Sequence, residues 1–155
     1  PEKRNENLVS LEWSHDSQHV LIQTRRGEEN YFTVINVQNL GARCGVGCEL
    51  SFLGPHIGAV SFSPSQPDNR VIATRLLGDS ELLFEADYSA QTDIRALWSD
   101  IIAFTTQPDR IIWLDVEGTL WEHRIANSSS DPKHLFEENV RIEIKKIIAT
   151  SLTVK

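Results

Sequence analysis

The chain has 155 residues, 40% of them hydrophobic, and carries a formal net charge of −7 at pH 7. This length supports one ordinary hydrophobic core. The excess of acidic residues argues against direct nucleic-acid binding, which requires lysine and arginine to displace counterions from phosphates. No apolar run approaches the roughly 18 residues of a membrane-spanning helix, so we expect neither nucleic acid nor a membrane as a partner.

The segment 1–7 is polar and mixed in charge, without the features of a signal or transit peptide. We interpret it as a disordered tail. The presence of only two cysteines favours a reducing environment. Together these features predict a cytoplasmic or nuclear protein.

A first unit of strands is predicted within 8–53. Residues 8–13 alternate between two sets of side chains, which is the period of a half-buried strand. Strands are also predicted at 19–24 and 31–37, where β-branched and aromatic residues are frequent. The charged loop between them contains Gly27, which can adopt the positive φ of a hairpin turn.

Two similar units are predicted to follow, over 54–92 and 93–136. In the second unit, strands are expected at 59–62, 71–75 and 81–87. In the third unit, an inner strand is expected at 94–98, and further strands at 101–106, 110–115 and 119–125. Residues 137–155 contain alternating apolar and charged side chains. They predict a strand of a partial fourth unit with one solvated face, or alternatively a helix.

The predicted inner strands end in the large aromatic residues Trp13, Phe62 and Trp98. Their spacing is close to the about 40 to 50 residues of a four-stranded repeat. We therefore expect Trp13 and Trp98 in the core, where each would pack one sheet on the next.

This pattern resembles the blades of β-propeller proteins. The segments 13–17 (Trp-Ser-x-Asp-Ser) and 31–37 (Tyr-x-x-Val-x-Asn-Val) are similar to repeats of the TolB and dipeptidyl-peptidase types. The segments 55–56 (Pro-His) and 62–64 (Phe-Ser-Pro) resemble a WD-type repeat more loosely. In the last third of the chain, 115–121 resembles the repeats of regulator-of-chromosome-condensation propellers.

Two positions depart from these repeats. Ser17 stands where glycine is usual, which indicates a different type of turn. The Trp-Asp dipeptide of WD-type repeats is missing, and Ala86-Asp87 is the nearest equivalent. A hydrogen-bond relay from His56 to an aspartate therefore lacks its usual partner.

The resemblance implies an all-β fold of antiparallel four-stranded blades, with about three blades and part of a fourth in an incomplete ring. Closed propellers contain four to eight blades. An open segment would leave strand edges whose unpaired N–H and C=O groups invite another strand. We therefore expect either a longer parent chain or a protein partner that completes the propeller or pairs at its open edges.

No combination of residues predicts catalysis, a metal site or a cofactor. Ser63 lacks the glycines of a nucleophile elbow, and the histidines form no H-E-x-x-H motif. Cys44 and Cys48 form a single C-x₃-C pair, to which His56 is a conceivable third ligand. We expect free thiols here, with a disulfide or a pair of metal ligands as alternatives.

Two regions are candidates for protein binding. The charged loop 25–30, together with the loop 63–70, would form a contact surface at the tops of the blades. Trp113 and Trp121 flank one predicted hairpin and share a sheet face, and tryptophan is frequent among binding hot spots. The candidate residues are Arg25, Arg26, Arg110, Trp113, Trp121, His123 and Arg124.

These features predict a non-catalytic β-propeller scaffold that mediates protein–protein interaction. An alternative is a propeller domain that gates or selects substrate for a hydrolase outside this chain, which the peptidase-like first repeat implies. A small all-β sandwich that binds a ligand is a further alternative, in which the repeats are coincidental.

Overall fold

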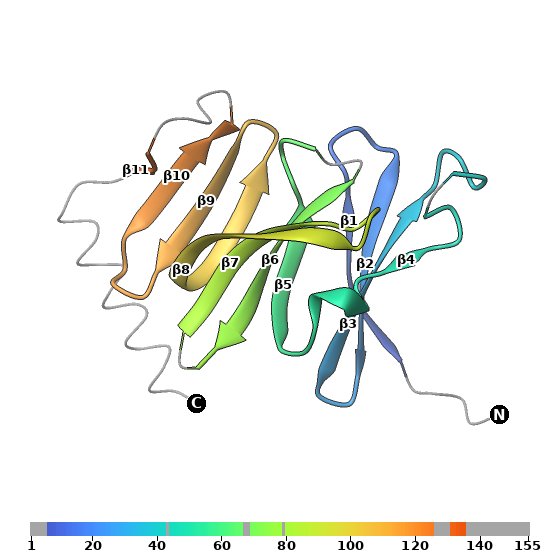
Figure 1. Ribbon diagram of the computed structural model, residues 1–155, viewed down its shortest axis with the longest axis horizontal. Helices are drawn as coiled ribbons and strands as arrows, with labels where there is room; N and C mark the ends of the chain where they lie inside the picture. Colours follow the sequence, from blue (N-terminus) through green and yellow to red (C-terminus); the bar gives the residue numbers. More distant parts are fainter. Residues whose placement is uncertain (1–5, 43, 67–68, 79, 126–130, 136–155) are drawn as a thin grey trace.

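The computed structural model describes residues 6–42, 44–66, 69–78, 80–125 and 131–135, which form two antiparallel sheets (Figure 1). The first sheet contains, in spatial order, β1 (Asn7–Trp13), β2 (His19–Arg26), β3 (Glu29–Asn36) and β4 (Cys48–Glu49). A short 3-10 helix, η1 (Ser51–Leu53), leads to the second sheet. That sheet contains, in spatial order, β5 (Ile57–Phe62), β6 (Arg70–Leu77), β7 (Ser80–Asp87), β8 (Thr92–Gln107), β9 (Arg110–Asp115), β10 (Leu120–Arg124) and β11 (Lys133–His134).

The seven-stranded sheet consists of two blades that share the long strand β8. The first part of β8 pairs with β7, and the part from Ile101 onward pairs with β9. We therefore name β1–β4 blade 1, β5–β7 with 92–100 blade 2, and 101–107 with β9–β11 blade 3. The prediction of antiparallel four-stranded blades is confirmed.

The predicted role of residues 94–98 was wrong. They were expected to form the inner strand of the third unit, but Ala96 and Trp98 pair with Phe84 and Leu83 of β7. This segment is therefore the outer strand of blade 2. An alternating pattern identifies a strand but not the strand with which it pairs, because that choice depends on contacts distant in sequence.

Blade 2 is buried on both faces because it lies between the other two blades. Val71, Ala73 and Phe84 belong to the core shared with blade 1, whereas Ile72 and Leu83 belong to the core shared with blade 3. These five residues are no more than 1% exposed. Two buried faces explain why β6 and β7 each contain three consecutive apolar residues, 71–73 and 82–84.

The inner strands of the three blades are joined by side-chain hydrogen bonds. The Ser61 hydroxyl on β5 donates to the Glu12 carboxylate on β1 at 2.6 Å. It also lies 2.7 Å from the Thr106 hydroxyl, in the part of β8 that belongs to blade 3. One serine thus connects three blades along their inner strands, the arrangement expected around a propeller axis.

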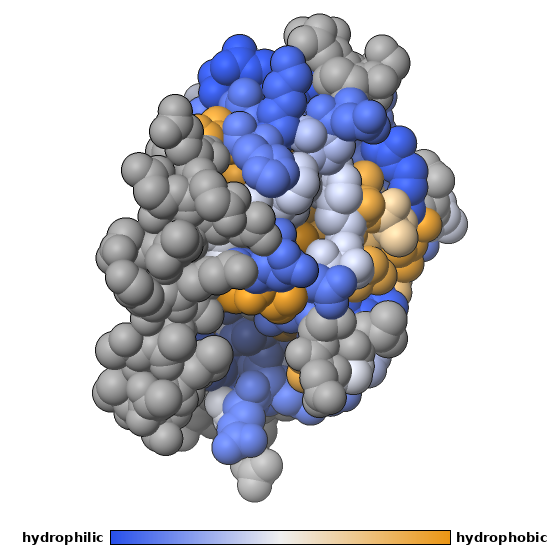
Figure 2. Space-filling model, turned by 90° about the vertical axis from the view of Figure 1, so that its left-hand side faces the viewer, coloured by the Kyte–Doolittle hydropathy of each residue, from blue (hydrophilic) through white to orange (hydrophobic). Residues whose placement is uncertain are grey.

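Some sequence predictions fall at the limits of the described residues. The predicted strand of a fourth unit within 137–155 lies outside them. Asn7, assigned to the tail, is the first residue of β1. The described part of the chain contains no helix of the length and hydropathy that a bilayer span requires. Seen from the side of blade 3, hydrophobic and hydrophilic surface areas lie next to each other (Figure 2).

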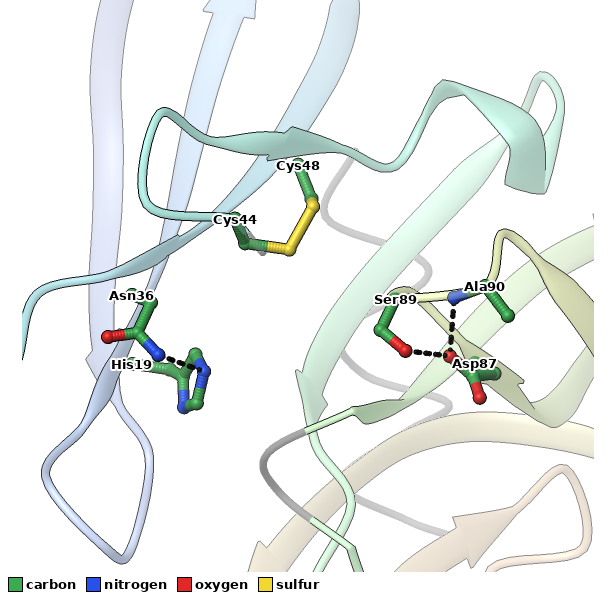
Figure 3. Close-up of a disulfide and its surroundings, with 7 residues drawn as sticks. All are labelled: His19, Asn36, Cys44, Cys48, Asp87, Ser89 and Ala90. Carbon is green, nitrogen blue, oxygen red and sulfur yellow. Dashed lines mark hydrogen bonds between the residues drawn. A yellow bond between two sulfur atoms is a disulfide. The ribbon is translucent and has the colours of Figure 1, made fainter. Parts of the chain in front are cut away.

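Cys44, in the loop after β3, forms a disulfide with Cys48 at the start of β4 (Figure 3), so the expectation of free thiols was wrong. The turn between them brings their Cα atoms to 4.8 Å, with Cys44 at a φ of 65°. Cys44 is buried and belongs to the core shared by blades 1 and 2. The spacing alone did not reveal this turn, because it depends on the left-handed backbone at Cys44.

Candidate partner-binding site

Trp13 and Phe62 occupy equivalent positions in blades 1 and 2. Trp13 pairs across its sheet with Val20, and Val20 pairs with Ile35. In blade 2, Phe62 pairs in the same way with Val71, which pairs with Ala86. Directly paired residues lie on one face of a sheet. Each aromatic side chain therefore belongs to the corresponding face of its blade.

The two equivalent faces differ in what covers them. Phe62 is fully buried, because blade 1 packs on that face of blade 2. Trp13 is 57% exposed, so the expectation that it lies in the core was wrong. The sequence shows that Trp13 faces a neighbouring blade, whereas its exposure depends on whether a blade lies there.

The uncovered side of blade 1 is apolar over three strands. Leu11 is 56% exposed and Leu8 is 61% exposed. Their pairing with Ile22 and Thr24 of β2 places both on the same side of β1 as Trp13. Ile22 and Ile35 continue this surface as half-buried residues on β2 and β3. We call these five residues, Leu8, Leu11, Trp13, Ile22 and Ile35, the open face. None of them is charged, and a continuous uncharged patch of this kind is typical of an interaction surface.

Charged residues border this surface at the hairpin end of the sheet and at β4, where the exposed Glu49 pairs with Thr33 of β3. Arg26 forms an ion pair with Glu6, and its guanidinium lies 4.8 Å from the centre of the Tyr31 ring. The Tyr31 hydroxyl donates to Glu29 at 2.7 Å, and this bond raises the pKa of Tyr31 above its ordinary value. Arg25 is exposed and donates to Asn30 at 3.3 Å. Arg25 and Arg26 therefore lie beside the open face rather than within it.

The loops 25–30 and 63–70 do not form one contact surface. The turn between β2 and β3 lies at one end of the blades, and the connection from β5 to β6 lies at the other (Figure 1). This follows from the alternating strand directions, because the two loops join different pairs of strands. The predicted common surface at the tops of the blades was wrong.

The aromatic candidates lie between blades 2 and 3. Trp113 is 4% exposed and stacks on Trp98, with ring centres 3.9 Å apart. Trp121 pairs directly with Trp113 and donates its indole N–H to Asp115 at 2.8 Å. His123 is half-buried, and the centre of its ring lies 5.4 Å from that of Trp98. Trp113 and Trp121 share a face as predicted, but that face packs inward, against blade 2.

The remaining candidates, Arg110 and Arg124, lie on the opposite side of blade 3. Arg110 donates to Glu122 at 2.9 Å, and Arg124 donates to the other carboxylate oxygen at 3.2 Å. The structure thus divides the seven candidate residues among three places. It also adds Leu8 and Leu11, whose exposure the sequence did not signal.

The side chains considered for chemistry have structural contacts. The buried Ser63 hydroxyl donates to Glu85 at 2.7 Å. Asp87 accepts hydrogen bonds from Ser89 and from the Ala90 amide (Figure 3), rather than from His56. Within the described ranges, no group of three histidine, cysteine or carboxylate residues is placed to hold a metal ion.

No protein-family model and no curated protein sequence matches this chain. Solved structures do. TolB from Acinetobacter baumannii is 14% identical with a TM-score of 0.61, over 86% of this chain and 33% of TolB. Hsv2 from Kluyvelomyces marxianus is 12% identical with a TM-score of 0.50, over 84% of this chain and 40% of Hsv2. A Saccharomyces cerevisiae structure of Dbp5 bound to Nup159 and Gle1 is 11% identical with a TM-score of 0.50, over 84% of this chain and 30% of the matched chain.

TolB and Hsv2 are β-propellers, so the stacked blades of this chain have the β-propeller fold. The chain spans about a third of the length of TolB and 40% of that of Hsv2. At identities of 14% and below, the similarity shows the fold alone.

Proposed function

We propose that this chain is a non-catalytic propeller scaffold whose open face binds a β-sheet of a protein partner. One observation carries the proposal: Trp13 is 57% exposed, whereas the equivalent Phe62 is fully buried under a neighbouring sheet. A second sheet placed on blade 1 would give Trp13 the environment that Phe62 already has.

The energetics support this contact. Full burial of a valine or leucine side chain stabilises by about 1.5 to 3 kcal/mol. Leu8, Leu11 and Trp13 are each 56% exposed or more, so burying them would contribute roughly 1 kcal/mol or more per side chain. Aromatic and aliphatic anchors at the centre of a patch, with charges such as Arg26 at its rim, match the usual anatomy of protein interfaces.

The scaffold role is also supported by the contacts of the polar side chains. Ser63 is bonded to Glu85, and His19 is buried with its Nε2 atom 3.1 Å from the Asn36 amide nitrogen. These groups serve to hold turns and strand ends together. A scaffold needs these structural contacts and an exposed surface, and both are present.

Site-specific photo-crosslinking in native cells tests the proposal. A photoreactive amino acid at position 11 should form a discrete adduct with one protein. The matched control is position 116, because Val116 is 51% exposed but lies in the turn between β9 and β10, away from the open face. Absence of an adduct at position 11, or equal adducts at both positions, would overturn the proposal.

A further inference from the structure

The outer side of blade 3 repeats a feature of blade 2. In blade 2, Ile72 pairs with Glu85, and Glu85 forms an ion pair with Arg70 at 3.3 Å. In blade 3, Ile112 pairs with Glu122, which forms an ion pair with Arg110 at 2.9 Å. Each arginine precedes the isoleucine of its blade by two residues. The two faces therefore share an Arg–Ile–Glu arrangement in the same register, although Asp87 of blade 2 is replaced by Arg124 in blade 3.

In blade 2 this face is the one that blade 3 covers. Ile72 is fully buried and Glu85 is 5% exposed. The charge of Glu85 is balanced within blade 2, by Arg70 and by Arg95, which donates at 2.9 Å from the first part of β8. Blade 3 contributes neutral residues such as Ile111 and Trp113 to this contact. A face with internally paired charges thus packs against a neutral, apolar face.

The corresponding face of blade 3 is less covered. Its residues Ile112, Leu114 and Leu120 are half-buried. The Arg124 side chain, which pairs with Glu122, is 49% exposed. We call Arg110, Ile112, Leu114, Leu120, Glu122 and Arg124 the outer face of blade 3. Its glutamate is paired by two arginines of its own blade, so a neutral partner surface would leave no charge of Glu122 uncompensated.

We propose that the open face of blade 1 binds the outer face of blade 3 of a second copy of this chain. This inference rests on the proposed function and names its partner. Each internal contact joins a face equivalent to the open face with a face equivalent to the outer face of blade 3. Among the residues that the structure describes, one example of each kind has no blade packed on it, and the two lie at opposite ends of the stack of blades (Figure 1).

The contact is head-to-tail, because it joins two different surfaces. Pairing the open face with itself would stack two Trp13 faces, an arrangement that neither internal contact uses. Head-to-tail contacts produce a closed ring or an open polymer. Two copies with three blades each would provide about six blades, within the range of closed propellers.

Sedimentation of the purified chain and two variants tests this inference. Leu11→Glu alters the open face, and Leu114→Glu alters the outer face of blade 3. We expect the unaltered chain to form a dimer or polymer, and each variant alone to sediment as a monomer. Ile94→Glu, which places a new charge on the outer strand of the middle blade where Ile94 is 48% exposed, is the control and should assemble as the unaltered chain does.

Mixing the two variants is the decisive step. Leu11→Glu keeps an intact outer face of blade 3, and Leu114→Glu keeps an intact open face. An equimolar mixture should therefore form a heterodimer through one contact, at least about tenfold more weakly than a ring with two contacts. Formation of this heterodimer also shows that both variants are folded.

Several outcomes would overturn the inference. They are a monomeric unaltered chain, unchanged assembly of Leu114→Glu, and a folded mixture that stays monomeric. The proposed function fails separately, through the absence of a specific adduct at position 11. An adduct there with a different protein would support the proposed function and reject the second copy as its partner.

Discussion

The Glu12 carboxylate accepts hydrogen bonds from the Ser61 hydroxyl at 2.6 Å and from the Phe62 amide at 3.2 Å. These bonds connect β1 of blade 1 to β5 of blade 2. Phe62 is fully buried in the core between the same two blades. The hydrogen bonds of Glu12 and the apolar core around Phe62 therefore both stabilise the interface between blades 1 and 2.

Replacement of this carboxylate tests the polar tie. Glu12→Ala should lower the free energy of unfolding by about 1 to 3 kcal/mol, because it leaves two partly buried donors without their acceptor. Glu12→Gln retains an acceptor oxygen and should therefore lower the free energy of unfolding by less than Glu12→Ala does. Chemical denaturation measures both. Glu28→Ala, on the exposed hairpin turn, serves as the control and should change little.

The strands of blade 1 could be predicted because a half-buried strand alternates with a period of two. The exposure of Trp13 could not, because it depends on the presence of a neighbouring sheet. The pattern at 94–98 identified a strand but not its partner, β7. The Arg110–Glu122 pair escaped detection because its members meet only through the register of β9 and β10.

Ser17 supports a second prediction. It has a φ of 58°, the left-handed backbone that glycine adopts without a steric penalty. The turn thus keeps a glycine-like conformation with a serine. Ser17→Gly should raise the free energy of unfolding by about 0.5 to 1 kcal/mol, after allowance for the greater freedom of glycine in the unfolded chain.

Ser17→Ala is the matched control, since it removes the hydroxyl but keeps the Cβ atom that causes the strain. Thermal and urea denaturation of the unaltered chain and the two variants should show that Ser17→Gly is the most stable of the three. If the alanine variant gained as much stability, the effect would come from the hydroxyl and not from the backbone.

The Cys44–Cys48 disulfide should stabilise the segment that leads into β4. Closing a loop of about five residues contributes about 2 kcal/mol in the chain-entropy model. The Cys44 carbonyl accepts hydrogen bonds from the Asn36 and Gly47 amides, at 2.9 and 3.0 Å. Reduction should therefore accelerate amide hydrogen exchange at these two positions and lower the denaturation midpoint.

A Cys44→Ala/Cys48→Ala variant provides the control, because its exchange should not respond to the reductant. Blade 3 lies beyond the core that contains Cys44, so exchange in β9 should stay unchanged in both proteins. Equal acceleration in β9 would indicate global unfolding in place of the local effect.

Asp87 makes stability depend on pH. Partial burial acts to raise the pKa of Asp87, but hydrogen bonds from Ala90 and Ser89, with Arg70 nearby, outweigh it and lower the pKa below 3.8. A lowered pKa in the folded state means that the ionised group stabilises the fold above the unfolded pKa. This contribution is lost as the pH falls from about 4 through the folded value.

Asp87→Asn separates the charge from the hydrogen bonds. Asn36, at the equivalent position of blade 1, accepts bonds from the Gln38 and Asn39 amides with a neutral side chain. The variant should therefore fold, be less stable than the unaltered chain at neutral pH, and lose less free energy of unfolding between about pH 5 and pH 3. Urea denaturation at several pH values across this range measures the slope of the free energy of unfolding against pH. If Asp87→Asn left this slope unchanged, protonation of other groups would account for the acid sensitivity. Glu28→Gln, at an exposed position, is the control for the loss of a carboxylate that makes no such contacts.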